Sequence, residues 1–187
     1  MSMFQTGTTQ YLLNQVALSN SMRSIWVNNN QWIRELIFSI LFDIGGREAI
    51  EARLRQNAED FSTIFTQFYG QEIGDRIRQN YLSYIQGISA LLEAFRNNDP
   101  SGIADQRRIL YDAADQLAQT LSEINRYWDR AALQTQIQEL VNFTENEVLR
   151  ITGGDFAESI REYDEWMEQT YHFADDLASG ILRQFHI

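Results

Sequence analysis

The chain has 187 residues and a mass of 21.8 kDa, which suits a single domain with a buried core. With 44% hydrophobic and 22% charged residues and a mean hydropathy of −0.38, it is expected to fold rather than to be largely disordered. It contains no cysteine, which excludes disulfides, thiolate nucleophiles and zinc–sulfur sites.

Charge and hydropathy argue against two classes of partner. The net charge is −11, and all 15 basic residues are arginines scattered among acidic residues, so we expect no nucleic-acid partner. The longest apolar stretch, residues 36–41, is far shorter than the roughly 20 residues of a membrane span, and no span is expected. No apolar signal region follows the start. A cytoplasmic location is therefore the default expectation, while a spore-associated or extracellular location stays open.

Residues 1–20 differ from the rest because they carry no charge and are rich in Thr, Gln, Asn and Ser. Their apolar side chains need a surface to cover; those concerned are Tyr11, Leu12, Leu13, Val16 and Leu18. Two interpretations stay open: an extension of the first helix packed on its own bundle, and an assembly arm that contacts a second copy. We expect residues 1–20 as this N-terminal segment and residues 21–187 as one helical-bundle domain.

Apolar residues recur at helical spacing along the chain, and no run with a period of two indicates a strand. The predicted helices are, in chain order, residues 9–43, with an interruption near Asn20 left open, a shorter pair at 47–57 and 60–69, and then 71–97, 100–124, 129–151 and 155–182. Capping signals at Asp99-Pro100 and at Asp155 with Glu158, and glycine pairs at Gly45-Gly46 and Gly153-Gly154, set several of these bounds.

Short loops make sequential helices antiparallel neighbours. The predicted fold is therefore all-α: an up-and-down antiparallel helical bundle, similar to a four-helix bundle with an additional N-terminal helical segment. Binary patterning places Trp26, Trp32 and Tyr84 in its interior.

The parts that common enzyme chemistries need are missing. There is no cysteine or lysine nucleophile, no Gly-x-Ser-x-Gly elbow and no glycine-rich phosphate loop. Glu168 and His172 share a helical face, but a di-metal bundle needs a Glu-x-x-His motif on two helices, and none occurs. The sequence therefore predicts no catalytic residue, no cofactor and no metal ligand.

Short motifs follow one another in a fixed order along residues 24–186. They are Ile25-Trp26, Trp32-Ile33-Arg34, Phe68-Tyr69-Gly70, Glu72-Ile73-Gly74, Tyr111-Asp112-Ala113-Ala114-Asp115, Leu121-Ser122, Tyr163-Asp164 and Ser179-Gly180-Ile181. In order and spacing this set resembles a family of uncharacterised small helical-bundle proteins from spore-forming Gram-positive bacteria. Residues 1–20 lie outside the resemblance.

The resemblance implies a four-helix bundle with an approximate internal duplication, whose halves carry histidines that point inward. At the matching positions this chain has Asn29, Tyr84, Leu140 and Met167, none of which can act as an imidazole base or ligand. Whatever chemistry those histidines support is therefore not expected here, which favours a protein that is not an enzyme.

Two functions from different classes follow. The leading hypothesis is a non-enzymatic structural or self-assembling protein, a repeating subunit whose partner is itself, as a homo-oligomer or a filament. The alternative is a small-ligand or metal-binding module with a polar pocket between helices, lined by Asn29, Arg34, Tyr84 and Glu147.

Overall fold

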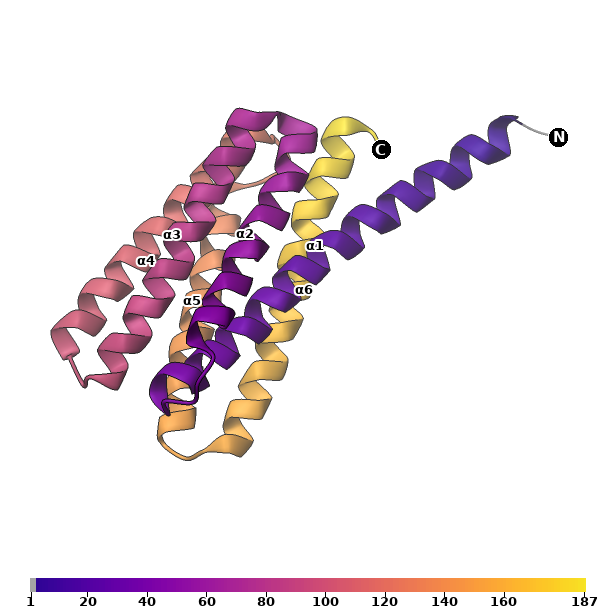
Figure 1. The fold of residues 1–187 in the computed structure, drawn as a ribbon. Helices are drawn as coiled ribbons and strands as arrows, with labels where there is room; N and C mark the ends of the chain where they lie inside the picture. The colour runs from indigo at the N-terminus through magenta and orange to yellow at the C-terminus, as the bar shows by residue number, and fades with distance from the viewer. Residues whose placement is uncertain (1–2) are drawn as a thin grey trace.

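The structure, a computed structural model, describes residues 3–187, with side chains from residue 12 onward. Over that range it contains helices and no strand, which confirms the all-α bundle (Figure 1). The helices are α1 (Met3–Leu41), α2 (Arg47–Tyr69), α3 (Gln71–Arg96), α4 (Pro100–Ile124), α5 (Arg130–Thr152) and α6 (Phe156–Phe185). None of these helices combines the length and apolar character that crossing a membrane requires.

The helices run up and down, and each one packs against the next in the chain. The sequence of neighbours closes on itself because α6 returns to pack along α1. The C-terminal half of α1 also contacts α3 and α5 in addition to α2, so it lies at the centre of the bundle. The α1–α2 loop and the α5–α6 turn lie at the end of the bundle that is remote from the N-terminus (Figure 1).

Aspartates cap three helices at their N-termini, and two of these caps, Asp99 and Asp155, agree with the predicted capping signals. Asp99 accepts a hydrogen bond from the Gly102 amide at 3.0 Å, and Pro100 follows it at the first helical position. Asp129 and Asp155 cap α5 and α6 in the same way. These caps satisfy backbone amides that a helix start otherwise leaves without partners.

Two predicted details of the helices need correction. The pair predicted at 47–57 and 60–69 is one helix, α2, because Asn57 is buried inside it and not exposed at a break. Its side-chain amide donates to the backbone oxygen of Ile25 at 2.9 Å, so a polar residue sits in the core as a tie between α1 and α2. The possible interruption near Asn20 is absent, since α1 is continuous there.

An aromatic cluster forms the centre of the core. The ring of Trp26 lies 5.4 Å from Phe61, 5.5 Å from Tyr81 and 4.8 Å from Phe173, so α1, α2, α3 and α6 meet at one point. The predicted burial of Trp26 and Tyr84 is confirmed, whereas Trp32 is only partly buried at the edge of the core. The approximate internal duplication stays a prediction.

Candidate functional site

The N-terminal part of α1 extends beyond the rest of the bundle (Figure 1). We call residues 3–17 the arm. Near its base, Gln15 donates a hydrogen bond to the backbone oxygen of Ile187 at 3.2 Å, beside the C-terminus of α6. The arm carries no charged residue, because the first one in the chain is Arg23.

The described side chains of the arm leave apolar surface in solvent. Leu12, Leu13 and Val16 are 54%, 57% and 56% exposed. Leu18 differs from them, because it is only 8% exposed and belongs to the bundle core. The side chain of Tyr11, also predicted as part of the arm, lies outside the described residues.

Helical geometry explains why the chain's own bundle does not cover Leu13 and Val16. The core-facing side of α1 includes Met22 and Ile25, both buried. Leu13 and Met22 are nine residues apart, about two and a half turns, and therefore lie on opposite sides of the helix. The same spacing separates Val16 from Ile25. Leu13 and Val16 thus face away from the surface on which α1 itself packs, whereas Leu12, 18 residues before the buried Asn30, is exposed because the arm extends beyond the bundle.

The four residues predicted to line a polar pocket lie between the helices, in the interior. Asn29 accepts a hydrogen bond from the Tyr81 hydroxyl at 2.8 Å and is fully buried. Tyr84 lies next to Tyr81, and its hydroxyl has no hydrogen-bond partner among the described residues. Burial raises the pKa of Tyr84 well above its ordinary value, so it stays a neutral phenol.

The other two residues predicted to line the polar pocket, Arg34 and Glu147, form an ion pair. The Arg34 Nε atom lies 3.1 Å from Glu147 Oε1, and the Ser159 hydroxyl donates to the same oxygen at 2.9 Å. The guanidinium also donates to Ser159 at 3.1 Å and covers the ring of Tyr163. Burial raises the pKa of Glu147 and outweighs the opposing effect of Arg34. These contacts tie α1, α5 and α6 together. The second carboxylate oxygen of Glu147, Oε2, has no hydrogen-bond partner among the described residues.

The Glu168–His172 pair, which the sequence places on one helical face, lies on the surface of α6. The His172 Nε2 and Glu168 Oε1 atoms are 4.0 Å apart, and both side chains are more than 60% exposed. Among the residues that the structure describes, no three His, Cys, Asp or Glu side chains gather as metal ligands would. Two exposed side chains supply too few ligands to hold an ion.

The positions at which the resemblance implies histidines belong to four different helices. Asn29, Tyr84 and Leu140 are buried, and Met167 is partly buried. Met167 lies beside Asn30, with its sulfur 3.9 Å from the Asn30 amide nitrogen. All four therefore lie in or next to the core, where this chain has side chains that only pack or hydrogen-bond.

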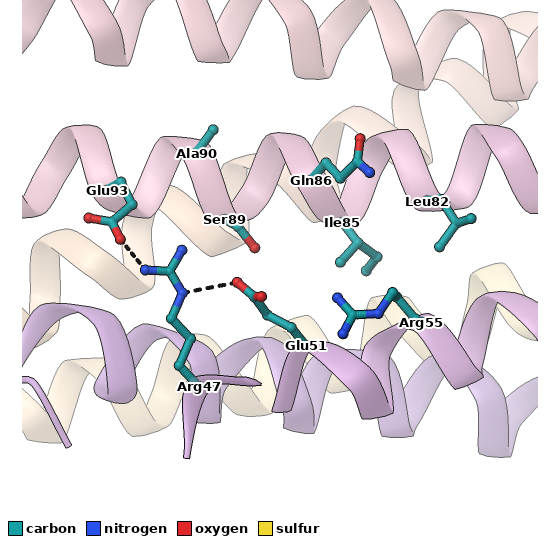
Figure 2. A pocket seen from close by; sticks show the side chains of 9 residues that line it. All are labelled: Arg47, Glu51, Arg55, Leu82, Ile85, Gln86, Ser89, Ala90 and Glu93. Carbon is teal, nitrogen blue, oxygen red and sulfur yellow. Dashed lines mark hydrogen bonds and ion pairs between the residues drawn. The ribbon is translucent and has the colours of Figure 1, made fainter. Parts of the chain in front are cut away.

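A surface groove between α2 and α3 was not predicted. It has a volume of about 300 Å³, and Leu82 and Ile85 contribute apolar surface to it. Figure 2 shows Arg47, Glu51 and Arg55 reaching into it from α2. Arg47 bridges Glu51 and Glu93, whereas Arg55 has no ion-pair or hydrogen-bond partner in the described part of the chain. The spacing of these three residues, four apart along α2, is the one signal in the sequence.

Comparison with known proteins adds no assignment: no family model, no curated protein and no solved structure matches the chain. The resemblance to small helical proteins of spore-forming bacteria therefore stays a prediction. The arm, the buried polar groups and the groove are the three features from which a function can be argued.

Proposed function

We propose that the protein is a non-enzymatic, self-assembling helical bundle whose arm binds a second copy of the same chain. The observation that carries this proposal is the uncharged end of α1, with Leu12, Leu13 and Val16 each more than half exposed. Apolar side chains gathered on one surface favour association, at about 25 cal/mol for each Å² removed from water.

Charge favours the arm over the rest of the surface as the point of contact. The chain carries a net charge of −11, so two copies repel one another over most of their surfaces. Over its whole length the arm has no Asp, Glu, Lys or Arg, and a second copy can approach it without that repulsion. A heterologous partner is not needed to cover it.

The test is the mass of the particle in solution, measured by light scattering after size-exclusion chromatography over a range of concentrations. We expect the full chain to reach a multiple of 21.8 kDa as the concentration rises. A variant with Leu12→Ser, Leu13→Ser and Val16→Ser should remain at the mass of one chain and keep the same helical circular dichroism.

Ile109→Ser is the matched control, because Ile109 is a half-exposed apolar residue of α4, away from the arm. This control should associate as the unmodified chain does. If the unmodified chain keeps the mass of one copy at the highest concentration, self-assembly through the arm is wrong.

The groove between α2 and α3 supports a second candidate function, the binding of a small anionic ligand. The observation that favours it is the unpaired guanidinium of Arg55 beside the apolar surface of Leu82 and Ile85. An arginine fork binds a carboxylate or phosphate through two parallel hydrogen bonds, and the apolar surface would hold the rest of the ligand.

A thermal-shift screen with small organic carboxylates and phosphates tests this second function. Binding to the native state raises the melting temperature in proportion to the logarithm of the ligand concentration. We expect a shift for the unmodified chain and none for Arg55→Gln. A shift that Arg55→Gln retains would place the ligand elsewhere.

A further inference from the structure

Building on the proposed self-assembly, we propose where the arm binds: on an exposed apolar patch at the far end of the α1–α6 seam of a second copy. The exchange is reciprocal, so that the two copies form a closed, antiparallel dimer. We call this surface the seam patch and define it by Phe38 and Phe42 of α1 and Phe156, Ile160 and Tyr163 of α6.

Contacts at the seam join three of these residues, Phe38, Phe42 and Tyr163. The Phe38 and Phe42 rings stack at 6.0 Å, and the Arg34 guanidinium lies 6.0 Å from the Phe38 ring and 4.5 Å from the Tyr163 ring. Arg34 therefore joins the aromatic residues of α1 to those of α6. Ile160 and Phe156 precede Tyr163 by one and two helical turns on neighbouring positions of α6.

Phe156 and Ile160, the two patch residues nearest the start of α6, lie on the side of that helix that faces α1. Ile160 lies seven residues before Met167, which contacts Asn30 of α1, so both occupy the same face of α6. Phe42 at the end of α1 is 48% exposed, and Phe156 and Ile160 at the start of α6 are 52% and 56% exposed, so each leaves apolar surface in solvent. The seam patch is thus the counterpart of the arm at the opposite end of the bundle (Figure 1).

The arm and the seam patch lie on the same side of α1. Val16 and Arg34 are 18 residues apart, which is about five turns, so they project in the same direction. From Val16 to Phe38 the helix rises by roughly 33 Å, at about 1.5 Å per residue. A second copy turned end to end on that side of α1 brings its arm to the patch, and its own patch to the first arm.

The size of the two surfaces favours this reciprocal arrangement. A large aromatic side chain covers about 150–250 Å², so a half-exposed phenylalanine offers roughly 100 Å² and the patch about 300 Å². One arm on one patch is therefore far below the roughly 800 Å² per partner of a stable interface. Two such contacts within one two-fold interface, with the polar atoms around them, approach that size. A filament has one contact at each junction and lacks this gain.

Two arginines of α1 at the seam are each paired with a carboxylate of the same chain. Arg23 of α1 and Asp175 of α6 neutralise one another through two hydrogen bonds of 2.6 and 2.7 Å. Within the patch, Arg34 is paired with Glu147. A second copy therefore meets two paired arginines along the seam, together with the exposed carboxylates of Glu35 and Asp164.

The absence of cysteine allows a direct test by cross-linking, because each introduced thiol is the sole one in its chain. Chains with Leu13→Cys and chains with Ile160→Cys are mixed and treated with a short bismaleimide. We expect the mixed cross-linked dimer at a yield at least tenfold above that from Leu13→Cys with Ile109→Cys. Ile109 is 43% exposed, against 56% for Ile160, and lies on α4, so it controls for random collision.

A chain with both Leu13→Cys and Ile160→Cys should give a doubly linked dimer, with no larger product. A ladder of longer products would overturn the closed dimer, and cross-linking of Leu13→Cys with itself would show arm-to-arm contact and overturn the seam patch. A link within one chain, across roughly 30 Å of α1, would show that the arm folds back instead.

Light scattering on the same samples distinguishes failure of the proposed self-assembly from failure of the seam patch as the binding surface. An oligomer without the mixed cross-link leaves self-assembly intact and refutes the seam patch. A single-chain mass refutes both. Phe156→Ser with Ile160→Ser should weaken the dimer at least tenfold without loss of helical content, and an unchanged dissociation constant would refute the seam patch as well.

Discussion

Arg34→Met tests whether the buried carboxylate of Glu147 depends on its arginine. Methionine keeps most of the length and apolar packing of the arginine stem and removes the charge. Glu147 is 1% exposed, so without Arg34 it either stays charged and unpaired in the core or takes up a proton. Both outcomes lower the free energy of unfolding.

The proton sets an upper limit on the electrostatic part of that loss. A glutamate with an ordinary pKa of 4.5 is protonated in the unfolded chain only well below neutrality. Carrying it neutral at about pH 7 costs two and a half pKa units, or about 3.4 kcal/mol. At about pH 5 the same cost is about 0.7 kcal/mol. Part of this cost is already present in the unmodified chain, so we expect Arg34→Met to lose at most about 3 kcal/mol at about pH 7, which for this chain length lowers the melting temperature by at most roughly 12 °C.

The sign of the pH dependence follows from the direction of the shift. The pKa of Glu147 is raised in the folded state, and removal of Arg34 raises it further. The protonated native form then gains stability at low pH and loses it as the pH rises through the folded-state pKa. The deficit of Arg34→Met should thus shrink by more than half between about pH 7 and about pH 5.

Urea unfolding followed by circular dichroism, at one fixed protomer concentration, measures this difference. The double variant Arg34→Met with Glu147→Gln is the control, because it has no carboxylate to protonate and its deficit should not narrow in this way. An equal deficit for Arg34→Met at both pH values, or a loss below about 1 kcal/mol at about pH 7, would refute the dependence of Glu147 on Arg34.

Three further predictions concern the core. Gly180→Ala should destabilise the fold by about 1–3 kcal/mol in urea unfolding, because an added Cβ would lie 1.9 Å from the Trp128 indole nitrogen. Gly45→Ala is the control: no atom lies within 4 Å of its Cβ, so this change should alter the free energy of unfolding by less than about 0.5 kcal/mol. Trp26→Ala should cost about 3–5 kcal/mol by the same measurement, and a smaller loss would contradict its central place in the core. Burial raises the pKa of Tyr69 to about 12. The stability that the neutral Tyr69 phenol contributes should therefore be complete below its ordinary pKa of 10.0 and fall as the pH rises towards 12. Ultraviolet titration of the native chain should show this phenol ionising late, and ionisation near 10 would contradict its burial.

Much of the fold was predictable because helix signals in this chain are local. The aspartate caps and the short loops mark where the later helices begin, and these starts agree with the structure to within one residue. The division of α2 failed for a non-local reason. The predicted break lies between Asn57 and Asp60, whereas Asn57 is inside α2 and is stabilised by a hydrogen bond to Ile25 of a different helix. A partner 32 residues away leaves no trace in the local pattern.

Some functional features could likewise be predicted from the sequence, and others required the structure. The uncharged arm is evident from composition alone, because apolar residues without a charge stand out at the start of an acidic chain. The placement of Leu18 in the core required the structure, since it depends on where the bundle ends along α1. The seam patch was not predictable either, because it joins residues from the two ends of the chain through the pairing of α1 with α6.

The continuity of α1 has a thermodynamic consequence for the arm. A free peptide of that length would be mostly unfolded in water, because the first turn of a helix is costly to form and short helices are marginal. In this chain the packed half of α1 already supplies that first turn, so the arm needs only to be extended residue by residue. Binding would then order few additional groups, and less of the interaction free energy would be lost as entropy. Heating frays a helix from its open end, so association should weaken at temperatures below those that unfold the bundle.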